Sequence, residues 1–151
     1  MATSVADRAV LDTNILLAAT DESREDHEDA IAAINVWPAS GVVLYTSGQI
    51  LREYLAVATR PVDHNGLGMT QPDAIANVRA LRARLNLLSE DVKVSERLLE
   101  LLDTIECRGK QVHDANVVAT MLVHGIDTVV TLNVDDFARF GHQVRVVGLR
   151  G

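Results

Sequence analysis

The sequence predicts an α/β fold in which a parallel β-sheet is covered by helices on both faces. Short apolar runs of strand length alternate with longer segments whose apolar residues recur at helical spacing, and this alternation is typical of parallel sheets. A length of 151 residues favours a single domain, with its core over about residues 8–149. Only residues 61–70 look flexible, and they are expected to form a loop inside the domain.

Four apolar runs have the length and β-branched content of buried strands. They cover residues 9–13, 42–46, 127–133 and 144–148. The first run ends in Asp12, and a second apolar run follows at once, so the chain is expected to turn there from a strand into a helix.

Five further segments have helical spacing of apolar residues: 24–36, 47–60, 71–85, 95–108 and 113–124. Local signals mark several of their ends. Ser23 with Asp26 resembles a capping box before the first segment, and Pro61 stops the second. Gly109 is expected to cap the C-terminus of the fourth segment, and Gly125 ends the fifth.

The composition narrows the functional classes. One cysteine, Cys107, excludes an internal disulfide and favours a reducing cytoplasm. No apolar run approaches the length of a membrane span, and no signal-peptide pattern is found, so no membrane partner is expected. A formal net charge of −7 argues against a general nucleic-acid coat protein, which binds through excess Lys and Arg. A nuclease stays compatible with this charge, because bound metal offsets clustered acids.

Acidic residues follow two of the predicted strands. Asp12 comes directly after the first strand, and Asp135 and Asp136 follow the strand that ends near Thr131. Functional groups of open parallel sheets gather just beyond the carboxyl ends of the strands. These acids are therefore expected at one edge of the sheet.

Two more acids lie on predicted helices. Glu53 flanks the apolar stripe of its helix, and Asp114 opens a helix and shares its inward face. A carboxylate that points toward a core is costly unless it is paired or bound to metal. Several converging carboxylates are typical of a site for a hard cation such as Mg²⁺ or Mn²⁺.

The chain resembles the PIN-domain ribonucleases, and among them the VapC-like toxins of toxin–antitoxin pairs. The resemblance rests on four motifs in order, VLDTNILL, TSGQILREYLAVATRP, HDANVVATML and VVTLNVDDF. It implies a single PIN-like domain that acts as a metal-dependent endoribonuclease with Mg²⁺, or Mn²⁺ in its place. It also implies an RNA substrate, a cognate antitoxin that holds the protein inactive, and a homodimer.

The resemblance also implies roles for individual residues. Asp12, Glu53 and Asp114 would be the primary acids, and Asp136, or else Asp135, the fourth. Polar side chains that donate hydrogen bonds to these carboxylates and orient them would be those of Asn14, Ser47, Thr13, Thr131 and Asn133. Arg52 and Arg60 flank the Glu53 helix and are candidates for contacts to RNA phosphates.

Each acid also has an ordinary structural interpretation. Asp12 is a good turn former or helix cap, and Asp114 would be favoured by a helix dipole. Glu53 has Arg52 and Arg60 nearby as ion-pair partners, and Asp135 and Asp136 would suit the start of a short helix that ends near Phe140.

Two other functional classes remain beside the nuclease. A non-catalytic PIN-like scaffold for RNA or protein would keep the fold, but it has no need to hold repelling carboxylates together. A receiver-like signalling domain ranks last, because it requires an acid pair near the N-terminus and a Lys after a late strand. Neither is found in this sequence.

Overall fold

The structure is a computed structural model, and it describes residues 7–149. The predicted domain also includes residues 1–6 and 150–151, which lie outside the described part. The elements are β1 Arg8–Leu11, α1 Thr13–Thr20, α2 His27–Asn35, η2 Trp37–Ser40, β2 Val43–Ser47, α3 Gly48–Thr59, η3 Val62–His64, α4 Gln71–Arg82, β3 Asn86–Leu88, α5 Val92–Thr104, α6 Lys110–His124, β4 Thr128–Val130, α7 Val134–Phe137, η4 Ala138–Phe140 and β5 Arg145–Val147. Here η denotes a short 3₁₀ helix.

The sheet has five strands in the order β3-β2-β1-β4-β5, and every neighbouring pair is parallel. The predicted fold class is therefore confirmed. β1 is the central strand, and Val10 pairs with Tyr45 of β2 on one side and with Val129 of β4 on the other. Its residues Ala9, Val10 and Leu11 are almost fully buried, as expected for a strand with helices on both faces.

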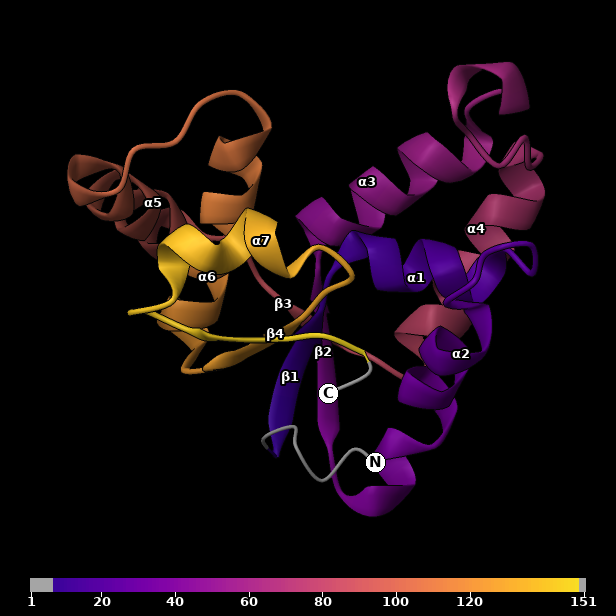
Figure 1. Cartoon of the computed structure of the whole chain (residues 1–151), viewed down its shortest axis with the longest axis horizontal. Coiled ribbons are helices and arrows are strands. Elements are labelled where there is room, and N and C mark those ends of the chain that lie inside the picture. The colour runs from indigo at the N-terminus through magenta and orange to yellow at the C-terminus, as the bar shows by residue number, and fades with distance from the viewer. Residues whose placement is uncertain (1–6, 150–151) are drawn as a thin grey trace.

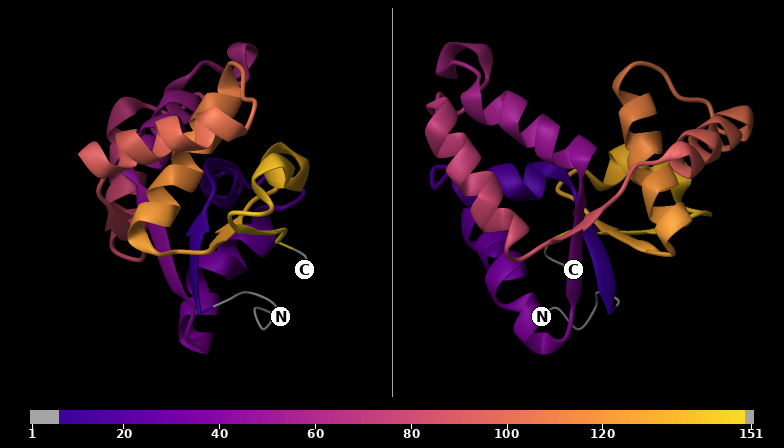
Figure 2. Two further views of the ribbon diagram at one scale, coloured as in Figure 1. Left: turned by 90° about the vertical axis from the view of Figure 1, so that its left-hand side faces the viewer. Right: turned by 180° about the vertical axis from the view of Figure 1, so that it is seen from behind.

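The helices form two groups, one on each side of the sheet. Helices α1 to α4 gather on one side, and α5, α6 and α7 lie on the other (Figure 1). The reverse view in Figure 2 shows the same division. The strand order explains it, because right-handed crossovers toward β2 and β3 place helices on one face, and crossovers toward β4 and β5 place them on the opposite face. No helix formed by residues 7–149 is long and apolar enough to cross a membrane.

Three predictions about the helices are wrong in detail. The capping box is absent: Asp26 makes no side-chain cap on α2, and the Ser23 hydroxyl instead donates to Asp21. α5 ends at Thr104, and Gly109 precedes α6 with a positive φ of 57° instead of capping α5. α6 therefore begins at Lys110, three residues before the predicted start.

One strand was not predicted. β3 is an edge strand of three residues, of which only Leu88 is buried. It lies at one edge of the sheet and begins with the polar Asn86, so it lacks the longer apolar run that identifies the other strands. The Asn86 side chain donates to the backbone oxygen of Leu44 at 3.2 Å and helps to hold β3 against β2.

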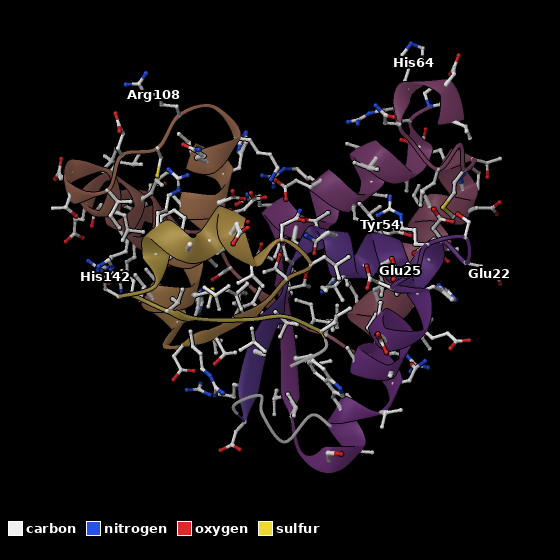
Figure 3. The ribbon with its side chains drawn as sticks, viewed as in Figure 1. Glu22, Glu25, Tyr54, His64, Arg108 and His142 are labelled. Carbon is white, nitrogen blue, oxygen red and sulfur yellow. The ribbon has the colours of Figure 1, made fainter. Side chains whose placement is uncertain are left out.

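Residues 61–70 are closed by backbone hydrogen bonds rather than open. Gly66 N–H donates to Pro61 O at 3.0 Å, and Leu67 N–H donates to Val57 O at 3.1 Å. Figure 3 shows His64 at the outer tip of this loop. The loop folds so tightly on the end of α3 that a Cβ at Gly66 would lie 1.9 Å from the backbone oxygen of Arg60.

We expect Gly66→Ala to destabilise the protein by about 1–3 kcal/mol, because the loop must open to admit the added carbon. Urea unfolding measures the change. Gly148→Ala is the matched control, since a Cβ at Gly148 would lie 3.6 Å from its nearest neighbour, the side chain of Val134, which is an ordinary van der Waals distance. Equal losses in the two variants would contradict the tight closure at Gly66.

Candidate metal centre

Asp12 joins β1 to α1 and extends the sheet by one hydrogen bond. Its N–H donates to Val130 O at 2.9 Å, so the residue stays at the carboxyl edge of the sheet. Its side chain accepts the Thr13 N–H at 2.8 Å on Oδ1 and the Thr131 hydroxyl at 2.8 Å on Oδ2. Asp12 is thus also the N-cap residue of α1, as the ordinary interpretation expected, and its carboxylate faces the end of β4.

Glu53 reaches the same edge from α3. The Thr13 hydroxyl donates to its Oε1 at 2.8 Å, and the Gln49 side-chain amide donates to its Oε2 at 3.2 Å. Its two oxygens therefore each accept a hydrogen bond. The expected ion pairs with Arg52 or Arg60 are not among the salt bridges of the described residues.

Asp114 lies on α6 and is only 8% exposed. Since α6 begins at Lys110, Asp114 stands in its second turn, where the helix dipole contributes little. The Lys110 ammonium lies 3.8 Å from Asp114 Oδ1 and 3.6 Å from Asp136 Oδ2. Asp136 therefore faces the same cation as Asp114, whereas Asp135 is exposed in the first turn of α7.

These side chains surround a single hollow of about 390 Å³, which we call the acid pocket. Its lining residues are Asp12, Thr13, Asn14, Leu17, Glu53, Val57, Arg60, Lys110, Asp114 and Asn133. Three of the four acids thus line the pocket directly. Asp136, on α7, lies beside the ammonium group of Lys110, which also lines the pocket.

Burial and like charge act together on the acids. The pKa of Asp114 is raised to about 6, mainly by burial; the Lys110 ammonium lowers it, and the carboxylates of Asp12, Asp136 and Glu53 contribute to the rise. Burial also raises the pKa of Asp12, against the hydrogen bonds from Thr131 and Thr13. The folded protein therefore keeps negative charge in the pocket at a cost, and a cation would relieve it.

The donor set has the chemistry that a hard divalent cation requires. Carboxylate oxygens are the ligands that Mg²⁺ and Mn²⁺ prefer, with water completing the coordination. Among residues 7–149, no three His, Cys, Asp or Glu side chains already stand close enough together to hold a metal ion. The acids surround the pocket without meeting at one point, and a lysine ammonium provides positive charge beside two of them.

The expected supporting residues have different places. Thr13 and Thr131 donate to the acids directly. Asn14 acts one step away, because its amide donates to the Thr131 hydroxyl at 3.2 Å and its oxygen accepts the Leu132 N–H. Asn133 lines the pocket and donates its backbone N–H to Thr131. The Ser47 hydroxyl accepts the Ile50 N–H and caps α3.

Two residues at the site were missed. The predicted start of α6 at residue 113 left Lys110 outside the helix, so its spacing of four residues from Asp114 carried no signal. Gln49 precedes Glu53 by one turn of α3, which is the signal that would have identified it. Of the two arginines proposed to contact RNA, Arg60 lines the pocket, and Arg52 is exposed on α3.

The raised pKa of Asp114 predicts how the stability of the metal-free protein depends on pH. The pKa of Asp114 is 3.8 in the unfolded state and about 6 in the folded state. The carboxyl therefore stabilises the fold fully when the pH is below 3.8, and this stabilisation is lost as the pH rises through about 6. Asp114→Asn should therefore be more stable than the wild type at about pH 8, by about 1–3 kcal/mol, since one pKa unit is worth about 1.4 kcal/mol.

Urea unfolding in EDTA at about pH 8 and about pH 4.5 measures this gain, which should fall by about half or more at the lower pH. Asp135→Asn removes an exposed acid and serves as the control with little change at either pH. A gain for Asp114→Asn that is independent of pH would contradict the role of its charge.

Comparison with known proteins gives one family match and several similar folds. A family model described as PIN domain matches residues 9–143, whereas no curated protein matches the sequence. VapC20 of Mycobacterium tuberculosis, described as a sarcin-ricin loop cleaving toxin, is 18% identical and has a TM-score of 0.64 over 90% of this chain and 95% of its own.

Two complexes contain chains of similar fold. VapBC-1 from nontypeable Haemophilus influenzae is 17% identical with a TM-score of 0.68, over 95% of this chain and 99% of that chain. A chain of DNA-bound VapBC from Salmonella typhimurium is 20% identical with a TM-score of 0.67, over 94% of this chain and 98% of that chain. At these identities the likeness concerns the fold. The family model, however, covers strands β1 to β4 apart from Arg8, together with every acid of the pocket, and the chain therefore belongs to the PIN domain family.

Proposed function

We propose that this PIN domain is a metal-dependent endoribonuclease that hydrolyses RNA phosphodiester bonds, and that it is the toxin of a toxin–antitoxin pair. The family is one of nucleases, so phosphodiester hydrolysis is the reaction class. One observation carries the proposal: carboxylates from the end of β1, from α3 and from α6 line a single pocket, and a fourth, from α7, lies beside the Lys110 ammonium of that pocket. Such a concentration of negative charge has a use in catalysis and costs stability without one.

Asp12, Glu53, Asp114 and Asp136 would hold Mg²⁺, with Mn²⁺ as an alternative. When bound, the ion supplies an activated water and neutralises the charge that develops on the phosphodiester. Each acid comes from a different rigid element, so their spacing is set by the packing of the whole domain rather than by one flexible segment.

The protein's own residues orient these acids and add positive charge. Thr13 connects two of them, because its N–H binds Asp12 and its hydroxyl binds Glu53. Arg60 lines the pocket, and we assign it, with Arg52, to contacts with the phosphates of RNA. Lys110 already faces two acids, and it keeps the metal-free pocket from carrying the full charge of four carboxylates.

The toxin role is supported by the similar structures, several of which are described as VapBC or toxin–antitoxin complexes. We propose an antitoxin as the partner, a homodimer as the free form, and the cytoplasm as the location. An antitoxin helix would bind an apolar groove formed by the helices of residues 24–36 and 47–60. A hollow of about 330 Å³ lies beside α2, and Ile31, Ile34 and Leu81 are among its lining residues.

A non-catalytic PIN-like scaffold is the alternative. It predicts a folded protein that binds RNA or protein and neither binds metal nor cuts. The raised pKa values of Asp12 and Asp114 oppose it, since a scaffold gains nothing from carboxylates that resist ionisation.

Cleavage of a panel of structured RNAs tests the proposed activity. We expect the purified protein to cut with Mg²⁺ or Mn²⁺ and not with EDTA, and Asp12→Asn to lose about 100-fold or more of the rate while it stays folded. Asp114→Asn, purified in parallel, excludes a contaminating nuclease. Cutting that persists in EDTA, or in both variants, would contradict the metal mechanism, and metal binding without cutting would mean that the panel lacks the target.

The two neighbouring aspartates of α7 provide a sharper comparison. We expect Asp136→Asn to lower the cleavage rate at least about 10-fold, because Asp136 shares Lys110 with Asp114. Asp135→Asn should stay within about 3-fold of the wild type, since Asp135 is exposed and the ion pairs of Lys110 are with Asp114 and Asp136. The reverse order would make Asp135 the fourth acid.

A further inference from the structure

A chain of hydrogen-bonded side chains outside the acid pocket leads to Glu53. It starts at Glu90, which follows β3 and accepts the Gln49 N–H at 2.7 Å on Oε2 and the Asn116 amide at 2.9 Å on Oε1. The same Asn116 amide donates to Gln49 Oε1 at 2.7 Å. Gln49 Nε2 then donates to Glu53 Oε2 at 3.2 Å and to the backbone oxygen of His113 at 2.8 Å.

The direction of each hydrogen bond is set by the groups at the ends of this chain. Glu90 is a carboxylate and can only accept, so Asn116 must present its NH₂ group to it. That NH₂ group also faces Gln49, which must therefore present its oxygen to Asn116 and its own NH₂ group to Glu53. The amide of Gln49 thus has one orientation in which every contact is a donor facing an acceptor.

This chain of hydrogen-bonded side chains is also rigid. Gln49 is 4% exposed, and both polar atoms of its side chain have partners. The three residues come from α3, α6 and the segment after β3, so their contacts tie together the elements around the carboxyl edge of the sheet. A buried amide that is satisfied on all sides loses hydrogen bonds if it turns, which costs free energy.

We propose that Gln49, held by Asn116 and Glu90, is a positioning residue for Glu53. Gln49 restrains one carboxylate oxygen and Thr13 restrains the other, so the Glu53 side chain faces the acid pocket in a single conformer. The proposal deepens the proposed function and rests on it for the role of Glu53 as a metal ligand. Glu90 takes part from outside the pocket, as an anchor for the two amides.

Gln49→Met keeps the length of the side chain and removes the donor. We expect crystals of the metal-free variant to show Glu53 in several conformers or turned away from Thr13. Mn²⁺ affinity, measured by calorimetry, should fall about 10-fold, as is usual when a partner of a metal ligand is lost. Cleavage should lose kcat with little change in KM, since Gln49 lies behind the pocket.

Two further variants separate positioning from general destabilisation. Asn116→Ala leaves Glu53 its direct donor, so any loss of Mn²⁺ affinity must act through Gln49; we expect about 3-fold, and the double variant should be no weaker than Gln49→Met alone. Asn77→Ala is the matched control, because Asn77 donates to the hydroxyl of Tyr54, the residue next to Glu53. It should leave both the Glu53 conformer and Mn²⁺ affinity unchanged. Figure 3 labels Tyr54 on α3.

A single Glu53 conformer still bound to Thr13 in folded Gln49→Met would overturn the proposal, and so would an equal effect from Asn77→Ala. A wild type that binds no Mn²⁺ would refute the proposed metal centre instead. The crystallographic comparison of Glu53 decides the positioning role in that case as well, because it requires neither metal nor activity.

Discussion

The burial of carboxylates is the constraint on which the rest of this site depends. Burial is the main cause that raises the pKa of Asp12 and of Asp114, and the charges of neighbouring carboxylates add to it. Asp12, Glu53 and Asp114 line one small pocket, and Asp136 lies beside Lys110, which lines the pocket with them. The structure offsets part of this cost with hydrogen bonds to individual oxygens and with one ammonium group. The part of this free-energy cost that is not offset favours the binding of a divalent cation.

The parallel sheet explains why the acids meet. β1 and β4 end side by side, so Asp12 and Thr131 are brought into contact although they are far apart in sequence. Helices α3 and α6 lie on opposite faces of the sheet and reach its carboxyl edge from there (Figure 2). Thr13 and Gln49 then bind Glu53 from two directions. The geometry of the pocket is therefore a property of the whole domain, and the apolar core beneath it keeps these element ends in register.

Much of this was accessible from the sequence, because the strong signals are local and periodic. The buried strands and the acids that follow them, Asp12 and Asp136 among them, identify the sheet edge. Glu53 and Asp114 follow from helical spacing. The sequence did not predict β3 or the start of α6, because their local patterns are weak. β3 exposes two of its three residues, and α6 begins after a glycine that gives no side-chain cap. The contacts of Gln49 with Asn116 and Glu90 join separate elements, and no local pattern reports them.

An anomalous difference map from crystals soaked in Mn²⁺ tests most directly whether the four carboxylates form one metal site. We expect a peak in the acid pocket in contact with carboxylate oxygens of Asp12 and Asp114, with Lys110 displaced from its place between Asp114 and Asp136. The same soak of Asp114→Asn should give a much weaker peak. A wild-type map with no peak in the pocket, or with Mn²⁺ bound only elsewhere, would show that these carboxylates do not form a metal site.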